Sequence, residues 1–247
     1  MKALITGASS GIGLEMAKYL STLGYDLVLV ARNKKKLEEI KKDIATNVLI
    51  FDYDLSNLDN CYKLYDNVKY MGIDILINNA GFGLFGDYTN SDLDIEMNMV
   101  DLNVKALHIL TKLFVNNNGI KHILNVASSA GLMKGGPLMS TYYATKSYVC
   151  NYSFALYEEL RRNKSNISIS VLCPGPVDTN FNSRANVRFN VKSMSPRDVA
   201  KYAIDSMFKK KLIILPGFGV KMGIFFMRFV PVKLLLRITY RFQKKKG

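Results

Sequence analysis

The chain has 247 residues, of which 49% are hydrophobic, so it can bury a substantial core, which argues against wholesale disorder. This length suits one large α/β domain. Three cysteines without paired or metal-ligand spacing and two scattered histidines exclude a disulfide scaffold, a metal site and a histidine-based triad. The chain begins with an apolar strand and a glycine-rich turn, without a secretory signal, so we expect a cytoplasmic protein with reduced cysteines.

The positive charge is concentrated at the end of the chain. The formal net charge is +14, and the segment from Val220 to Gly247 carries eight Lys or Arg residues and no acid. A basic segment of this kind suits an anionic partner.

Predicted strands and helices alternate along the chain. The expected strands are 3–5, 26–32, 48–51, 74–77, 122–127, 167–172 and 211–215. The expected helices are 14–23, 34–43, 57–70, 91–115, 142–160 and 196–209, the last capped by Ser195 and Pro196. Such alternation predicts an α/β fold: a doubly wound parallel sheet of about seven strands with helices on both faces. We expect one catalytic domain over 1–217, followed by a basic, apolar helical extension over 218–247.

A glycine-rich turn separates the first strand from the first helix. Gly7, Gly11 and Gly13 have the spacing G-x-x-x-G-x-G. At such a junction, backbone N–H groups and the helix N-terminus can hold a phosphate. Gly7 would make the tight turn, Gly11 would let a pyrophosphate approach, and Gly13 would let the helix pack on the sheet. The turn lacks the Lys-Ser/Thr pair of a nucleotide-hydrolysing P-loop. A plain strand-to-helix turn is the alternative.

The end of the second strand predicts the nucleotide preference. A site that prefers NAD usually has an acid here, whereas this chain has Ala31 and Arg32. A guanidinium matches a 2′-phosphate, so NADP(H) is the expected cofactor. Lys36 could add to the same pocket, while Lys34 and Lys35 fit better as the solvated first turn of a helix.

Tyr142 and Lys146 lie four residues apart in a long apolar-periodic run, so a helix places them on one face. An ammonium one turn away favours the phenolate form of the tyrosine, which makes Tyr142 a candidate proton donor and acceptor. Alone, this spacing is far more often a packed tyrosine near a solvated lysine.

Taken together, these features resemble the single-domain short-chain dehydrogenases/reductases over residues 1–217, with their Rossmann-type fold. The glycine turn looks like the cofactor turn of the family. Asp54-Leu55 resembles its adenine-contacting pair, and the segment 78–81 (Asn-Asn-Ala-Gly) resembles its sheet-stabilising signature. The segment 174–179, with Pro174, Gly175, Val177 and Thr179, resembles the stretch that contacts the nicotinamide carboxamide.

The resemblance implies the site residues. Ser129 lies at the family's distance of 13 residues before Tyr142, so it is preferred to Ser128, and Asn103 matches the asparagine that holds a water chain to the lysine. The implied catalytic residues are Asn103, Ser129, Tyr142 and Lys146. The implied cofactor-binding residues are Gly7, Ser9, Ser10, Gly11, Ile12, Gly13, Arg32, Lys36, Asp54, Leu55, Asn79, Ala80, Gly81, Tyr142, Lys146, Pro174, Gly175, Val177 and Thr179.

The implied reaction interconverts a carbonyl and a secondary alcohol with NADP(H). Ser129 and Tyr142 would hydrogen-bond the carbonyl oxygen, and Lys146 would lower the pKa of Tyr142. The resemblance also implies a homodimer or homotetramer. A non-catalytic NADP(H) sensor or a membrane-associated scaffold with the same fold is the alternative. An apolar substrate is suggested by residues expected near the mouth of the site: Phe82, Leu84, Phe85, Met133, Leu138, Met139 and Phe181.

Two interpretations of the C-terminal tail stay open. Lys233, Arg237 and Arg241 fall on one helical face among apolar residues, as in a helix that lies in an anionic membrane surface. The alternative is a terminal helix packed on the domain or on a second subunit. No apolar stretch is long enough to span a bilayer. Nucleic-acid binding is not expected, because the basic residues join no reader motif.

Overall fold

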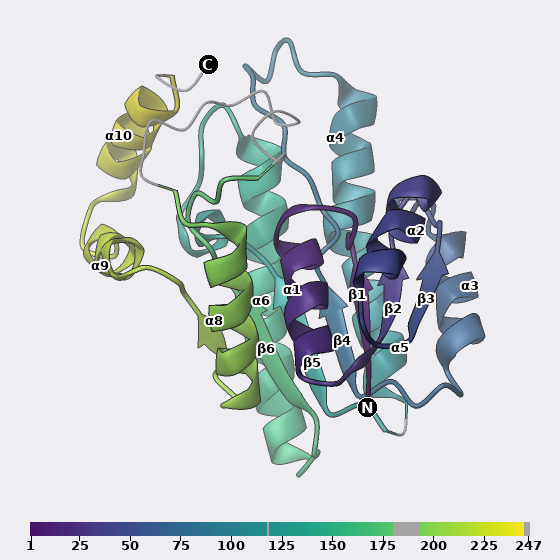
Figure 1. Ribbon diagram of the computed structural model, residues 1–247. Coiled ribbons are helices and arrows are strands. Elements are labelled where there is room, and N and C mark those ends of the chain that lie inside the picture. Colours follow the sequence, from purple (N-terminus) through teal and green to yellow (C-terminus); the bar gives the residue numbers. More distant parts are fainter. Residues whose placement is uncertain (118, 180–192, 245–247) are drawn as a thin grey trace.

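The computed structural model describes residues 1–117, 119–179 and 193–244. Seven parallel strands form one sheet in the order β3-β2-β1-β4-β5-β6-β7 (Figure 1). The strands are β1 (Lys2–Thr6), β2 (Asp26–Val30), β3 (Val48–Phe51), β4 (Ile75–Asn78), β5 (His122–Val126), β6 (Ser168–Leu172) and β7 (Ile213–Ile214). The order reverses between β1 and β4, so the sheet is doubly wound and the predicted fold class is confirmed.

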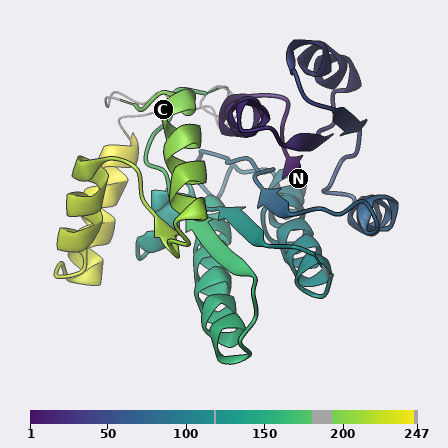
Figure 2. The ribbon, with the colours of Figure 1, turned by 60° about the horizontal axis from the view of Figure 1, so that its bottom comes forward.

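Helices cover both faces of this sheet. They are α1 (Gly11–Thr22), α2 (Lys34–Asp43), α3 (Asp59–Val68), α4 (Leu93–Val100), α5 (Leu107–Val115), α6 (Ser140–Arg162) and α8 (Pro196–Phe208). One core joins α1, α2 and α8 to the sheet, and a second joins α3, α5 and α6 to its other face. Figure 2 shows purple α1 and green α8 on one side and teal α5 and α6 on the other. Strands buried on both faces explain the continuous apolar runs of the sequence.

Parallel strands bring their carboxyl ends to one edge of the sheet, where the next loops meet. Asn79, just after β4, donates from Nδ2 to the carbonyl oxygens of Thr6 (3.0 Å) and Gly7 (3.2 Å). Thr6 Oγ1 in turn accepts from the backbone N–H groups of Asn79 and Ala80, each at 3.0 Å. These bonds hold the end of β4 against the glycine-rich turn.

Two predicted helices differ in detail. The expected helix 91–115 contains a π-helical turn, Asp101–Ala106, between α4 and α5. The expected helix 57–70 spans Asp59–Val68, and just before it the Ser56 hydroxyl and N–H both donate to Asp54 Oδ1. The Ser195 cap is confirmed, since its side chain accepts from the Asp198 N–H group.

The C-terminal tail forms two helices, α9 (Phe218–Met227) and α10 (Val232–Lys244), beside the main body (Figure 1). Leu235, Thr239 and Gln243 recur every four residues on α10 and are buried. Gln243 Nε2 donates to the hydroxyl of Tyr143 on α6 at 2.8 Å. The tail therefore packs on the domain through this stripe. Within the described ranges, no helix is both long enough and apolar enough to cross a membrane.

Candidate active site

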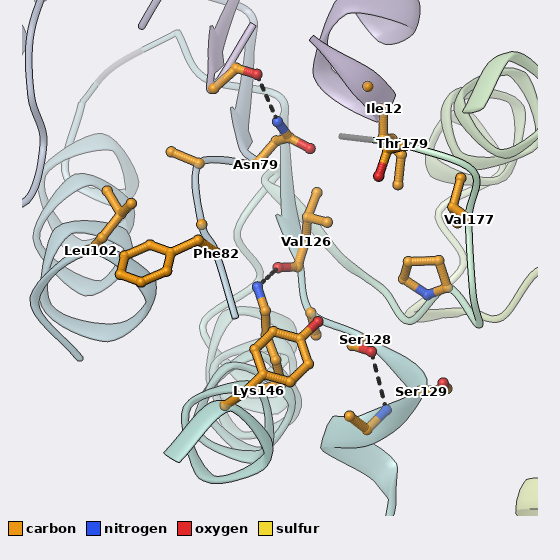
Figure 3. A pocket seen from close by; sticks show the side chains of 18 of the residues that line it. Ile12, Asn79, Phe82, Leu102, Val126, Ser128, Ser129, Lys146, Val177 and Thr179 are labelled. Carbon is orange, nitrogen blue, oxygen red and sulfur yellow. Dashed lines mark hydrogen bonds between the residues drawn. The ribbon is translucent and has the colours of Figure 1, made fainter. Parts of the chain in front are cut away.

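A cavity of about 670 Å³ opens at the carboxyl edge of the sheet. The loops after β1 to β6 line one part of it, and α1, α6, α9 and α10 contribute the rest. Figure 3 shows side chains from several of these segments converging on this space. The topology therefore gathers into one site most of the residues that the sequence motifs selected.

The glycine-rich turn and the start of α1 form an anion cradle at one end of the cavity. Gly7, Ser9, Ser10, Gly11 and Ile12 line it. The first turn of α1 contains no acid, and the N-cap residue Ser10 makes no side-chain capping bond, so N–H groups at the helix start remain available to an anion.

Gly7 and Gly13 serve the packing of this cradle. Gly7 has φ +65°, a conformation that favours glycine. A Cβ atom at Gly13 would lie 2.4 Å from Asn79 Nδ2, so only glycine lets α1 approach the sheet this closely. Gly13 does not line the cavity itself, which agrees with the packing role predicted for it.

Arg32 and Asp54 line the cavity where β2 and β3 end. Arg32 Nη1 lies 3.8 Å from Asp54 Oδ2, and both side chains are partly exposed. Asp54 is oriented by its two bonds from Ser56. Lys36, in the first turn of α2, is not among the residues that line the cavity, so its contribution to cofactor binding stays a prediction.

The reactive end of the cavity contains Tyr142, which is 8% exposed. Burial raises the pKa of Tyr142 to about 12, although a hydrogen bond with the Ser128 side chain acts in the opposite direction. The phenol is therefore protonated at neutral pH and can donate its proton. Desolvation of the phenolate is the largest cause of this shift, and the lowering of the Tyr142 pKa that we expect from Lys146 stays a prediction.

Two neighbouring serines line the cavity beside Tyr142, Ser128 and Ser129. The Ser128 side chain makes a hydrogen bond with Tyr142, and the choice of Ser129 from the family spacing stays a prediction. Ser128 immediately precedes a 3₁₀ turn, Ser129–Leu132, and Figure 3 shows Ser128 on the side of Ser129 that faces Lys146. Ser129 begins that turn and donates its N–H to the Pro174 carbonyl at 2.8 Å.

Lys146 lies one turn beyond Tyr142 and is 5% exposed. Its Nζ donates to the Val126 carbonyl at 3.0 Å, as Figure 3 shows, and lies 5.9 Å from the centre of the Tyr142 ring. Burial lowers the pKa of Lys146 to about 8. The ammonium thus remains the main form at neutral pH despite its burial, held at the end of β5.

Asn103 lies in the π-helical turn and is 1% exposed. Its Oδ1 accepts from the Phe82 N–H at 3.1 Å, and its Nδ2 donates to the Phe82 carbonyl at 2.8 Å. Nδ2 also reaches Thr145 Oγ1 at 3.2 Å, next to Lys146. Asn103 thereby fixes the loop after β4 but does not line the cavity. Its water link to Lys146 stays a prediction.

The remaining predicted residues divide between the cavity and its surroundings. Leu55, Asn79, Ala80, Gly81, Pro174, Gly175, Val177 and Thr179 line it, as do Phe82, Met133 and Met139. Leu84 and Phe85 pack against the adjoining apolar cluster, and Leu138 lies in the loop before α6. Phe181 lies outside the described residues.

The C-terminal helices supply lining residues that sequence reasoning missed. They are Met227, Leu235, Ile238, Thr239, Phe242 and Gln243. Gln243 is 2% exposed, and its Oε1 has no hydrogen-bond partner among the described residues. A Thr and a Gln four residues apart on the apolar stripe of a helix were the available signal, because polar groups there need a partner.

Comparison with known proteins identifies relatives over most of the chain. Residues 1–188 match the family model described as short chain dehydrogenase. An uncharacterized oxidoreductase of Staphylococcus epidermidis is 32% identical over 211 residues, covering 82% of this chain and 90% of that protein. A dehydrogenase/reductase SDR family protein 7-like from Dictyostelium discoideum is 31% identical, covering 80% of this chain and 64% of its own length.

Solved structures share the fold. A short-chain dehydrogenase from Sphingobium yanoikuyae in complex with NADPH has a TM-score of 0.80 and 29% identity, covering 88% of each chain. A bulky-bulky ketone specific alcohol dehydrogenase from Comamonas testosteroni has a TM-score of 0.75 and 27% identity, covering 88% of this chain and 86% of the other. The family match, the sheet order and the convergence of the motifs on one cavity agree, and the chain belongs to the short-chain dehydrogenase/reductase family of oxidoreductases.

Proposed function

We propose that this protein reduces an apolar carbonyl compound to a secondary alcohol with NADPH, or catalyses the reverse reaction with NADP. The observation that carries this proposal is the arrangement at the reactive end of the cavity. A protonated phenol is hydrogen-bonded to a serine hydroxyl, with a buried ammonium one helical turn away. A protein that only senses a nucleotide has no use for this proton donor.

The residues present fit a nicotinamide dinucleotide. The cradle at the start of α1 suits its pyrophosphate, Arg32 and Asp54 its adenosine end, and the segment 174–179 its nicotinamide end. When bound, the cofactor supplies the hydride. The Ser128 and Tyr142 hydroxyls orient the carbonyl oxygen, and Tyr142 donates its proton to that oxygen as the alcohol forms. The Lys146 ammonium stabilises the phenolate that remains.

The preference for NADP(H) rests on Arg32. The side chain is partly exposed at the cavity, and its contact with Asp54 is long enough, at 3.8 Å, for a competing phosphate to replace it. The Sphingobium relative, which was solved with NADPH, supports the same cofactor.

The substrate half of the cavity favours an apolar molecule with one hydrogen-bond donor. The apolar lining residues of this half come from the β4 and β5 loops and from α10. The Gln243 Oε1 atom is a buried acceptor without a partner among the described residues, and a hydroxyl or N–H group of the substrate would satisfy it. The ketone specificity of the Comamonas relative supports a carbonyl substrate of this bulk.

Removing either hydroxyl tests the proposed chemistry. NADPH oxidation should be followed over aliphatic, aromatic and steroid ketones. For ketones that the wild-type protein reduces, Tyr142→Phe should lower kcat by about 10²–10⁴-fold because the proton donor is lost. Ser128→Ala should lower kcat by about 10²–10³-fold. Ser129→Ala is the matched control and should stay near the wild-type rate. A larger loss in Ser129→Ala than in Ser128→Ala would contradict the assignment of the serine.

Cofactor binding tests Arg32. Arg32→Leu should weaken NADPH binding by roughly 10- to 100-fold, because a charge-assisted bond of about 1.5–3 kcal/mol is lost, and should change NADH binding little. Fluorescence titration with both nucleotides measures this. Lys36→Leu removes a neighbouring charge outside the cavity and should leave both affinities nearly unchanged. Equal losses of NADPH affinity in the two variants would show that the positive charge of this region, and not a specific contact of Arg32, accounts for the effect.

Paired substrates test Gln243. Ketones that carry a distal hydroxyl, with several spacings, should be compared with their deoxy counterparts. We expect at least one hydroxylated ketone to have a kcat/KM roughly 2- to 10-fold above its counterpart, as one hydrogen bond allows. Gln243→Met should remove this ratio, whereas Met133→Leu should keep it. An unchanged ratio in Gln243→Met would exclude Gln243 as the acceptor.

The buried ammonium predicts a pH-dependent stability effect. The folded-state pKa of Lys146 is about 8 against 10.5 for the free group, so between these values the unfolded chain binds more protons and this residue's contribution rises with pH. Below pH 8 the full cost of burying the Lys146 ammonium, on the order of 3 kcal/mol, lowers the stability of the folded state. The variant Lys146→Met lacks this cost at every pH. The free energy of unfolding of the variant, relative to that of the wild type, should therefore fall by about 2–3 kcal/mol from pH 7 to pH 10. Denaturant titrations measure this, and the exposed Lys112→Met should show no such trend.

A further inference from the structure

The helices α9 and α10 have an outer surface that the fold does not cover. Only Ile224 of α9 and Leu235, Thr239 and Gln243 of α10 are buried. Large apolar side chains remain exposed on both helices and on the turn between them: Phe218, Met222, Phe225, Phe226, Phe229, Val232, Leu234, Ile238, Tyr240 and Phe242. Every exposed phenylalanine in the described ranges belongs to this tail. Apolar patches of this kind mark interaction sites.

The exposed side chains form continuous stripes. On α9, Phe218, Met222 and Phe225 recur at the three- and four-residue spacing of one helical face, and Phe229 follows four residues later in the turn after the helix. The Phe225 ring lies 5.5 Å from the rings of Phe226 and Phe229, centre to centre, so the three form one aromatic cluster. The largest exposed fraction among the three is that of Phe229, at 73%.

On α10, the exposed apolar stripe lies beside the buried one. Leu234, Ile238 and Phe242 each precede a buried residue by one position, so they flank the stripe that packs on the body. Ile238 and Phe242 also line the cavity. The apolar flank of α10 therefore borders the cavity mouth.

The charges beside these stripes decide the kind of partner. Lys233, Arg237 and Arg241 follow one another at four-residue spacing on α10, and Lys221 on α9 and Arg228 just after it add two more cations. The chain contains no Asp or Glu after Asp205. Among the described residues, none of these five cations forms an ion pair with a carboxylate. Two copies of so basic a face would repel each other, which disfavours self-association through it.

We propose that the outer face of α9 and α10 docks on an anionic lipid bilayer, with the aromatic cluster inserted at the headgroup boundary and the basic residues against lipid phosphates. Helices with exposed Phe and Leu beside Lys and Arg bind membranes in this way without crossing them. Docking there places the cavity mouth next to the bilayer. The interaction does not depend on the proposed reaction.

Vesicle flotation of the full chain tests the charges. The wild-type protein should float with phosphatidylcholine vesicles that contain phosphatidylglycerol, and less with pure phosphatidylcholine. The triple variant Lys233→Gln, Arg237→Gln and Arg241→Gln should bind the anionic vesicles up to roughly 100-fold less, at about a factor of 5 per cation. The matched control, Lys41→Gln, Lys42→Gln and Lys63→Gln, changes net charge equally on α2 and α3, away from the tail (Figure 1), and should retain binding.

A second pair of variants tests the aromatic cluster. Phe225→Ser, Phe226→Ser and Phe229→Ser should release the protein from vesicles, while Tyr62→Ser, Tyr70→Ser and Tyr88→Ser, which remove exposed rings elsewhere, should not. Thermal melts establish that each variant is folded. Failure of the wild-type chain to float with anionic vesicles would overturn the proposal, as would equal losses in the control variants. A wild-type dimer that the phenylalanine variant dissociates, without vesicle binding, would assign this face to a second copy of the chain.

Discussion

The active site depends on a buried ammonium held by one backbone carbonyl. Burial on α6 removes water from the Lys146 ammonium, which is costly without a new hydrogen bond. The bond from Nζ to the Val126 carbonyl at the end of β5 compensates for part of this loss. That bond ties the helix to the sheet at the point where the strand ends. Because Tyr142 lies one turn earlier on the same helix, the bond also fixes where the phenol meets Ser128 in the β5 loop. The positions of the proton donor and of its partner follow from this contact.

A second set of contacts positions the opposite side of the cavity. Asn79 and Thr6 join the ends of β4 and β1, and Gly13 lets α1 approach them closely. Asn103 fixes the loop after β4 through the Phe82 backbone. These side chains are occupied in holding backbone, so their role is to make the cradle rigid before any ligand arrives. A rigid site lowers the entropic cost of binding.

The C-terminal helices have an inner face that borders the cavity and an outer face that is exposed. Their inner stripe closes the apolar half of the cavity through Leu235, Thr239 and Gln243, and Gln243 is anchored to Tyr143. Their outer surface leaves phenylalanine and basic side chains exposed. The two alternatives considered for the tail are therefore compatible, since packing on the domain uses only one narrow face of α10.

The sequence by itself determined the sheet and most of the cofactor cradle, because strand–helix alternation and glycine spacing are local patterns that backbone geometry imposes. It also identified the Tyr142–Lys146 pair, since a helix fixes what lies one turn apart. Tertiary structure decided what depends on contacts distant in sequence. The hydrogen bond of Ser128 with Tyr142 joins the β5 loop to α6, and burial raises the pKa of Tyr142. Lys36 is not among the residues that line the cavity. The contribution of α10 to the cavity could not be predicted from the sequence either, because Gln243 and Tyr143 are 100 residues apart and only folding brings them into contact.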